Sequence, residues 1–281
     1  MNMSTVKQLG ELRGPLLIFG GPYGNLQATQ AMKAVAEHLG IPVQNTFCTG
    51  DMVAYCGEPF ETIELIRDWG VHVVMGNCEE SLVSDAPDCG CGFEAGTTCS
   101  LLSVDWYRYA QGQVTAEQKQ WMQQLPSRID LSLAGRAIAL VHGGVSQINQ
   151  FFFPSTAEEV KAQELSQAKV DVVVGGHSGI PFGDRVCDGA WLNSGVLGMP
   201  ANDATTDGWY LILQVEDAVL TASWHRLAYD APKAAQVMMD VGLCGDYQEA
   251  LLTGLWPSMD ILPEQEKTQR GVPLACPTLT L

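Results

Sequence analysis

The stretch VQNTFCTGDMVAYCGEP, residues 43–59, decides the fold that the sequence predicts. An apolar segment ends at Gly50, the carboxylate of Asp51 follows at once, and turn-forming residues then carry the chain away. A parallel β-sheet presents ligands in this way, at the carboxyl end of a strand. Asp51 is therefore the first candidate for a functional residue.

Similar units lie on both sides of this stretch. Residues 15–20 have the pattern of a buried strand, and residues 26–39 that of an amphipathic helix. A second helix is expected over residues 60–69, and residues 71–77 form a third strand with its loop. Three strand-and-loop units in succession predict a parallel sheet with helices on its faces.

The chain changes character after the third unit. Residues 80–126 are predicted to form an insertion or cap. The runs RIDLSL and RAIAL, on either side of Gly135, predict a hairpin in a second, partly antiparallel sheet. We predict one α/β domain over residues 1–230, followed by a C-terminal helical appendage and irregular tail over residues 231–281.

The composition excludes several classes of protein. With 281 residues, 46% of them hydrophobic, the chain can bury a sizeable core. A net charge of −17 argues against nucleic acid or an anionic membrane as the main partner, because both would be repelled. The N-terminal apolar run is short, so neither a signal peptide nor a membrane-spanning helix is expected there. Without a secretory signal, the nine cysteines are expected as reduced thiols in a cytoplasmic protein. The sequence is compatible with a homo-oligomer.

Four side chains share one setting. Asp51, Asn77, His142 and His177 each follow an apolar strand within a glycine-containing loop, in the runs TGD, MGN, VHGG and GGH. Carboxyl ends of parallel strands meet at one edge of a sheet, so we expect these side chains to converge. A carboxylate, an amide oxygen and two imidazoles suit Mn, Fe or Zn. The sequence therefore predicts a site for a divalent transition metal.

An ordered set of motifs resembles a known family. GPYGN, TGDMVAYCGEP, GNCEE, VHGG and GGHSGIP follow one another between residues 21 and 181, with NSGVLGMP at residues 193–200. In this order they resemble the motifs of calcineurin-like metallophosphoesterases, most closely a bacterial branch related to diadenosine tetraphosphatases and small phosphodiesterases. The resemblance extends to about residue 230. It implies a four-layer α/β/β/α sandwich of two mixed sheets, with Asp51, Asn77, His142 and His177 as metal ligands.

The departures from the family pattern fall on one of its two metal sites. Gly21 and Tyr23 stand where the family has Asp-x-His, and Gly179 stands where it has the last histidine of Gly-His-x-His. In the family these positions bind the first metal. The resemblance therefore implies one divalent ion (Mn, Fe or Zn) and no second ion. One oxygen of Asp51 would then remain free for water, a substrate hydroxyl or Tyr23.

Three further residues are candidates for catalysis. Cys78 takes the place of the family's histidine that protonates the leaving group, and Glu79 keeps the acidic residue that follows it. Tyr23 is expected either to bind a phosphate oxygen or to pack into the space that the missing ligands leave. A thiolate cluster for zinc or iron–sulfur is an alternative that would explain Cys56, Cys78, Cys89, Cys91 and Cys99, although the spacing of the last three fits no standard motif.

The sequence thus predicts a hydrolase with a partly degenerate active site. Its expected activity is metal-dependent hydrolysis of a small phosphorylated substrate, with a single ion that activates water. The alternative is a family member without catalysis, which binds a phosphate-bearing ligand or a protein partner in the same pocket.

Overall fold

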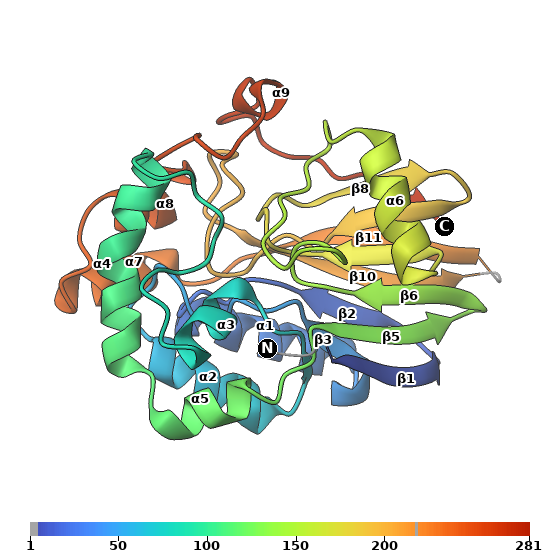
Figure 1. Cartoon of the computed structure of the whole chain (residues 1–281), viewed down its shortest axis with the longest axis horizontal. Coiled ribbons are helices and arrows are strands. Elements are labelled where there is room, and N and C mark those ends of the chain that lie inside the picture. Colours follow the sequence, from blue (N-terminus) through green and yellow to red (C-terminus); the bar gives the residue numbers. More distant parts are fainter. Residues whose placement is uncertain (1–4, 217–218) are drawn as a thin grey trace.

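The computed structural model describes residues 5–216 and 219–281, and its described strands form two mixed sheets that pack face to face (Figure 1). The first sheet has the order β1 (Val6–Leu12), β5 (Arg128–Leu133), β6 (Arg136–Leu140), β7 (Val172–Gly175), β9 (Gly189–Asn193) and β8 (Phe182–Val186). The second has the order β12 (Leu279–Thr280), β11 (Val219–Leu227), β10 (Gly208–Glu216), β2 (Leu16–Phe19), β3 (Thr46–Cys48) and β4 (His72–Val73).

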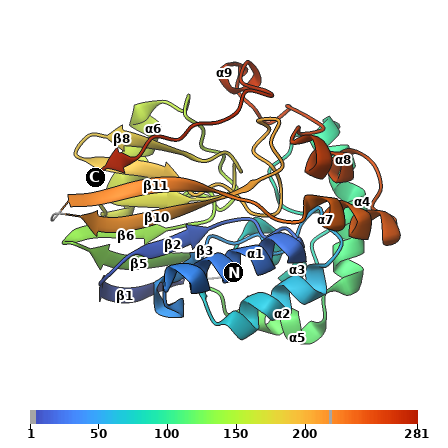
Figure 2. The ribbon, with the colours of Figure 1, turned by 180° about the vertical axis from the view of Figure 1, so that it is seen from behind.

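Helices cover the outer faces of both sheets. α1 (Leu26–Leu39) and α2 (Pro59–Trp69) pack on the second sheet, and α6 (Glu158–Ala168) packs on the first. Figure 2 shows α1 and α2 from behind. The remaining described helices are η1 (Val43–Asn45), α3 (Asn77–Val83), α4 (Thr98–Gln113), α5 (Ala116–Met122), α7 (Ala231–Asp240), α8 (Asp246–Thr253) and α9 (Glu264–Lys267).

The alternation of side chains along β2 shows how the layers are held together. Leu16 and Ile18 belong to the core between the two sheets, whereas Leu17 and Phe19 belong to the core beneath the helices. Successive side chains of a strand point to opposite faces, so a continuously apolar strand needs cover on both sides. The predicted four-layer α/β/β/α sandwich is confirmed.

The topology brings distant loops to one edge. β2, β3 and β4 run parallel to one another in the second sheet, and β6 and β7 run parallel in the first. Their carboxyl ends lie at the same edge of the sandwich, where the loops that follow them meet. This edge is where a parallel arrangement places a ligand site.

The strand β1 was not predicted from the sequence. It pairs in parallel with β5 at the edge of the first sheet, but most of its residues are exposed. The apolar pattern that identifies a buried strand is therefore missing from it.

The last part of the chain lies over its own domain. Trp256 donates its backbone N–H to Asn202 Oδ1 at 2.8 Å and its indole N–H to the Pro200 carbonyl at 2.6 Å. Near the end, β12 pairs with β11. The C-terminal segment thus contributes to the second sheet and to the cover of the edge described above. Within the described residues no helix has the length and apolar character needed to cross a membrane.

A buried carboxylate anchors this segment, and its replacement is expected to destabilise the protein. Asp203 Oδ2 accepts hydrogen bonds from Arg226 Nη2 at 2.6 Å and from the Leu274 N–H at 3.0 Å. Burial alone would raise the pKa of Asp203, but these two partners hold it below its usual value. We expect Asp203→Asn to lower the free energy of unfolding by about 1–3 kcal/mol at pH 7, measured by urea denaturation.

The difference between wild type and Asp203→Asn should depend on pH. Because the pKa of Asp203 is lowered in the folded protein, its stabilisation is present above the unfolded-state pKa of about 3.9 and is lost as the pH falls through the folded value. Asp207→Asn is the control, since Asp207 lies 3.8 Å from Arg226 and is more exposed. An unfolding difference that stays constant from pH 7 to pH 3 would contradict this assignment.

Candidate metal centre

Four side chains from four strand ends meet at the edge of the sandwich. His142 Nε2 lies 2.8 Å from Asn77 Oδ1, 2.9 Å from His177 Nδ1 and 3.3 Å from Asp51 Oδ2. All four residues are buried. Asp51 and Asn77 follow strands of the second sheet, while His142 and His177 follow strands of the first. The structure thus brings together the four residues that the sequence placed at one site.

Hydrogen bonds made by the other polar atom of His142 and of Asn77 hold their ligand atoms facing one another. His142 Nδ1 lies 2.7 Å from the Thr49 carbonyl, so it carries the proton and leaves a lone pair on Nε2. The amide nitrogen of Asn77 donates to the Cys89 carbonyl at 2.9 Å, which turns its oxygen towards His142. With bonds of about 2.1 Å, neighbouring ligands at right angles lie about 3 Å apart. The donor set therefore fits a divalent transition ion.

The charges of these groups also suit a cation. Burial would raise the pKa of Asp51, but the neighbouring His142 keeps it below its usual value, so this carboxylate is charged. Burial and the nearby His142 lower the pKa of His177 to about 3, which leaves a neutral imidazole at pH 7. Asp51, His142 and His177 are the acid, histidine or cysteine side chains in the described residues that gather closely enough to hold an ion.

Glu79 holds the two loops of the second sheet in place. Its carboxylate accepts N–H groups from Asp51 at 2.8 Å, Met52 at 2.8 Å and Gly76 at 2.9 Å. These bonds fix the backbone at Asp51, whose φ is 54°, in the left-handed region. Burial, with Asp51 nearby, raises the pKa of Glu79 to about 7. Glu79 therefore acts on Asp51 through the backbone.

The comparisons with known proteins agree with this geometry. The family model described as the calcineurin-like phosphoesterase superfamily domain matches residues 26–218, which is more than half of the chain. The chain belongs to the calcineurin-like phosphoesterase superfamily. This is a superfamily of hydrolases that use divalent metals, and the family resemblance predicted from the sequence is confirmed.

Individual relatives are distant. The chain is 23% identical over 173 residues to an uncharacterized protein of Methanocaldococcus jannaschii, a match that covers 61% of this chain and 65% of that protein. It resembles the crystal structure of a metallophosphoesterase from Sphaerobacter thermophilus with a TM-score of 0.66 and 21% identity, over 87% of this chain and 100% of the other. A hypothetical protein from Pyrococcus horikoshii OT3 aligns with a TM-score of 0.70 and 14% identity, over 86% and 99% of the two chains. At these identities the solved structures support the fold alone.

Apolar groups pack closely against Gly21 and Gly179, two positions at which the sequence resemblance implied lost metal ligands. A Cβ at Gly21 would lie 2.6 Å from the ring of Tyr23 and 2.6 Å from Val196, and the φ of Gly21 is +44°. A Cβ at Gly179 would lie 3.4 Å from the ring of Trp256, and its φ is +73°. A larger residue at either glycine would be strained in its backbone, and at Gly21 it would also clash.

Tyr23 and Cys78 occupy different surroundings. Tyr23 packs edge-on against Tyr55, with ring centroids 4.9 Å apart, and its ring takes the space beside Gly21. It also lines a cavity of about 60 Å³ together with Asp51 and His177. The thiol of Cys78 is fully buried and does not line that cavity. Burial and Asp51 raise the pKa of the Cys78 thiol well above its usual value.

The second oxygen of Asp51 has a partner that the sequence did not indicate. This oxygen, Oδ1, accepts the backbone N–H of Cys78 at 3.1 Å. Cys78 thus holds the carboxylate through its amide. No sequence pattern indicates this bond, because it depends on the N-terminus of α3 pointing its amide at the loop after β3.

The cysteines do not gather into a thiolate cluster in the described part of the chain. Cys89 and Cys91 are joined by a disulfide, and Cys91 Sγ lies 3.3 Å from the Asn77 amide nitrogen. Cys99 lines the same cavity as Cys91 but forms no metal-binding group with it, and its N–H donates to Asp260 at 3.3 Å.

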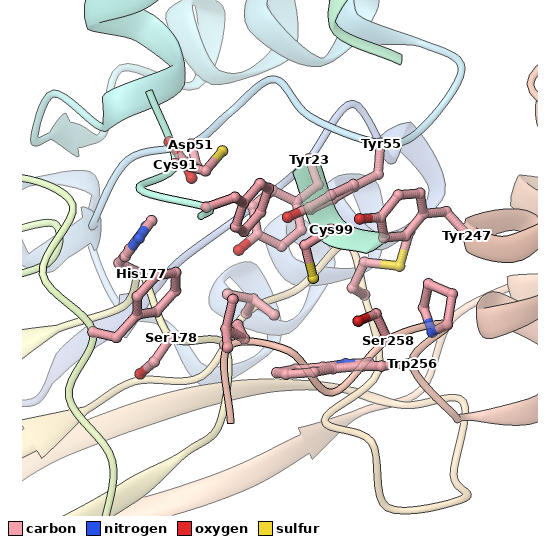
Figure 3. A pocket seen from close by; sticks show the side chains of 17 residues that line it. Tyr23, Asp51, Tyr55, Cys91, Cys99, His177, Ser178, Tyr247, Trp256 and Ser258 are labelled. Carbon is pink, nitrogen blue, oxygen red and sulfur yellow. The ribbon is translucent and has the colours of Figure 1, made fainter. Parts of the chain in front are cut away.

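Sequence reasoning missed several residues near the metal centre. Figure 3 shows that Tyr55 and Tyr247 lie beside Tyr23 on one side of the cavity, with Trp256 on the opposite side. Tyr55 lay within the stretch that suggested the fold, but its backbone φ of 44° directs it in a way that no pattern indicates. Tyr247 and Trp256 come from the C-terminal region, and no motif marks them.

Loss of the Glu79 carboxylate is expected to disturb the metal centre without removing a ligand. Glu79→Gln would place an N–H₂ group against at least one of the three backbone N–H donors, because Oε2 accepts from Asp51 and Gly76 and Oε1 accepts from Met52. We expect a loss of about 1–3 kcal/mol in the free energy of unfolding and about 10-fold weaker Mn²⁺ binding, measured by denaturation and calorimetric titration. Glu80→Gln, on the exposed side of α3, is the matched control and should change neither quantity. Equal behaviour of the two variants would show that Glu79 has no positioning role.

Proposed function

We propose that the protein is a metal-dependent phosphoesterase that hydrolyses a small phosphorylated molecule with a single divalent ion. Asp51, Asn77, His142 and His177 would hold this ion, which is Mn, Fe or Zn. The observation that carries the proposal is the close approach of their four ligand atoms, with His142 Nε2 within 3.3 Å of the other three. Family membership supports the reaction class.

The packing at the other positions supports a single ion. The residues that match the family's first-metal ligands are Gly21, Tyr23 and Gly179, and neither glycine offers a donor side chain. Tyr23, Val196 and Trp256 occupy the space around them. Apart from neutral phenol hydroxyls, an ion next to Asp51 on that side would meet aromatic rings and aliphatic carbon, with no carboxylate or imidazole at Gly21, Tyr23 or Gly179.

The side chains of the site have separate tasks in this proposal. A bound divalent ion supplies Lewis acidity and lowers the pKa of water. Asp51 and His177 line the cavity, so substrate reaches the ion from that side. Glu79 keeps Asp51 in position, and the Thr49 carbonyl keeps His142 in the tautomer that can bind metal. The buried Cys78 thiol lies outside the cavity lining and is a weak candidate for the proton donor that the sequence suggested.

The surface charge limits the substrate. A net charge of −17 repels long polyanions, so the substrate is expected to be a small molecule rather than a polynucleotide. The cavity of about 60 Å³ is consistent with this size.

Hydrolysis by the metal-loaded protein is the direct test. After treatment with a chelator and reloading with Mn²⁺, the wild type should hydrolyse p-nitrophenyl phosphate esters, and Asp51→Asn and His142→Gln should each lose at least about 100-fold in kcat/KM. His225→Gln is the control, since His225 lies on β11, away from the site. Equal rates in wild type and Asp51→Asn would contradict the proposal. Metal-dependent binding of phosphate esters with no turnover would favour the non-catalytic alternative.

A further inference from the structure

The cavity next to Asp51 and His177 is walled by aromatic rings from three separate segments. Tyr23 follows β2, Tyr55 follows β3, and Tyr247 belongs to α8 in the C-terminal region. The centroids of Tyr23 and Tyr55 lie 4.9 Å apart, and those of Tyr55 and Tyr247 lie 4.4 Å apart. Figure 3 shows the three rings in a row across the cavity from Trp256. The C-terminal region therefore completes the site.

The hydroxyl groups of these tyrosines are available to a ligand. All three residues line the cavity. The side chain of His177 is also buried, and its Nε2 has no partner. Buried polar atoms are rarely left without partners, so His177 Nε2 indicates a polar ligand in the cavity, where the three tyrosines can contact the same ligand.

The tyrosines remain donors at neutral pH. Burial raises the pKa of Tyr23, Tyr55 and Tyr247 above the usual value of a phenol. Each hydroxyl therefore keeps its proton, and it can donate a hydrogen bond to an anionic oxygen.

The charge of the site selects the ionisation state of that ligand. No lysine or arginine is among the described residues that line the cavity. Asp51 supplies the carboxylate that lines the cavity, whereas the Glu79 carboxylate lies outside the lining and is held by three backbone N–H groups. Among the lining groups, a divalent ion beside Asp51 leaves one net positive charge. This balances a phosphodiester, which carries one negative charge, whereas a phosphomonoester dianion would add an uncompensated charge in apolar surroundings.

We propose that this cavity is a subsite for singly charged phosphodiesters, in which the hydroxyls of Tyr23, Tyr55 and Tyr247 bind a non-bridging phosphoryl oxygen where the family places its first ion. This substrate class rests on the single-ion phosphoesterase proposed above. The volume of about 60 Å³ holds about four to six waters, which is room for a phosphoryl group and the atoms next to it. The rest of the diester extends through the opening.

Tyr247→Phe is the most informative variant, because Tyr247 is the tyrosine that comes from outside the loops holding the ligands. In the Mn²⁺-loaded protein it should lower kcat/KM for bis(p-nitrophenyl) phosphate about 10- to 100-fold, the value of a hydrogen bond to a charged group. Metal content, measured by elemental analysis, should stay at the wild-type level. Tyr210→Phe, on β10, is the matched control and should leave both quantities unchanged.

A binding measurement gives a second readout that does not need turnover. Diethyl phosphate carries one charge and phenylphosphonate carries two at pH 8, and both can be titrated into the Mn²⁺-loaded protein by calorimetry. We expect diethyl phosphate to bind at least about 10-fold more tightly than phenylphosphonate. Tyr247→Phe should weaken the binding of diethyl phosphate and leave the binding of phenylphosphonate unchanged.

The two proposals fail in different ways. If the protein hydrolyses esters but prefers the monoester, or if Tyr247→Phe binds diethyl phosphate as well as wild type does, the diester subsite is wrong and the phosphoesterase stands. If no ester is hydrolysed but diethyl phosphate still binds preferentially through Tyr247, the subsite stands and the phosphoesterase is wrong. Loss of diethyl phosphate binding in Tyr210→Phe as well would overturn the assignment to Tyr247.

Discussion

The imidazole of His142 connects the two sheets at the candidate metal centre. It follows β6 of the first sheet, yet Nδ1 faces the Thr49 carbonyl and Nε2 faces Asn77 and Asp51, which all follow strands of the second sheet. A buried imidazole needs partners for both nitrogens, so the relative position of the sheets and the orientation of the ligands are set together. This explains why loops from distant parts of the sequence can form one site with ligand atoms about 3 Å apart.

On the side away from His142, the neighbours of Asp51 are aromatic and aliphatic side chains rather than metal ligands. Gly21 and Gly179 leave room that Tyr23, Val196 and Trp256 fill, and Trp256 is held there by Asn202 and Pro200. One half of the edge is thus a compact set of metal ligands, and the other half is an aromatic wall with hydroxyl groups. In our account the wall takes over the binding of phosphoryl oxygen, and the C-terminal region contributes to catalysis as well as to stability.

Sequence patterns were sufficient for the parts of the structure that repeat along the chain. Apolar strands that end in glycine and a polar residue identified the sheets and placed Asp51, Asn77, His142 and His177 together, because parallel strands order their carboxyl ends. The patterns were not sufficient for contacts that depend on tertiary packing. The mostly exposed β1 has no buried face, the Cys78 amide bond to Asp51 depends on the direction of α3, and Tyr247 reaches the site from a helix that carries no motif.

The number of ions bound per chain tests the central claim most directly. The protein should be equilibrated with excess Mn²⁺, dialysed and analysed for metal, with Asp51→Asn as the reference for ion bound elsewhere. A single site made by Asp51, Asn77, His142 and His177 predicts one ion per chain in the wild type and none in Asp51→Asn. Two ions per chain, or one ion that survives the loss of Asp51, would contradict the account.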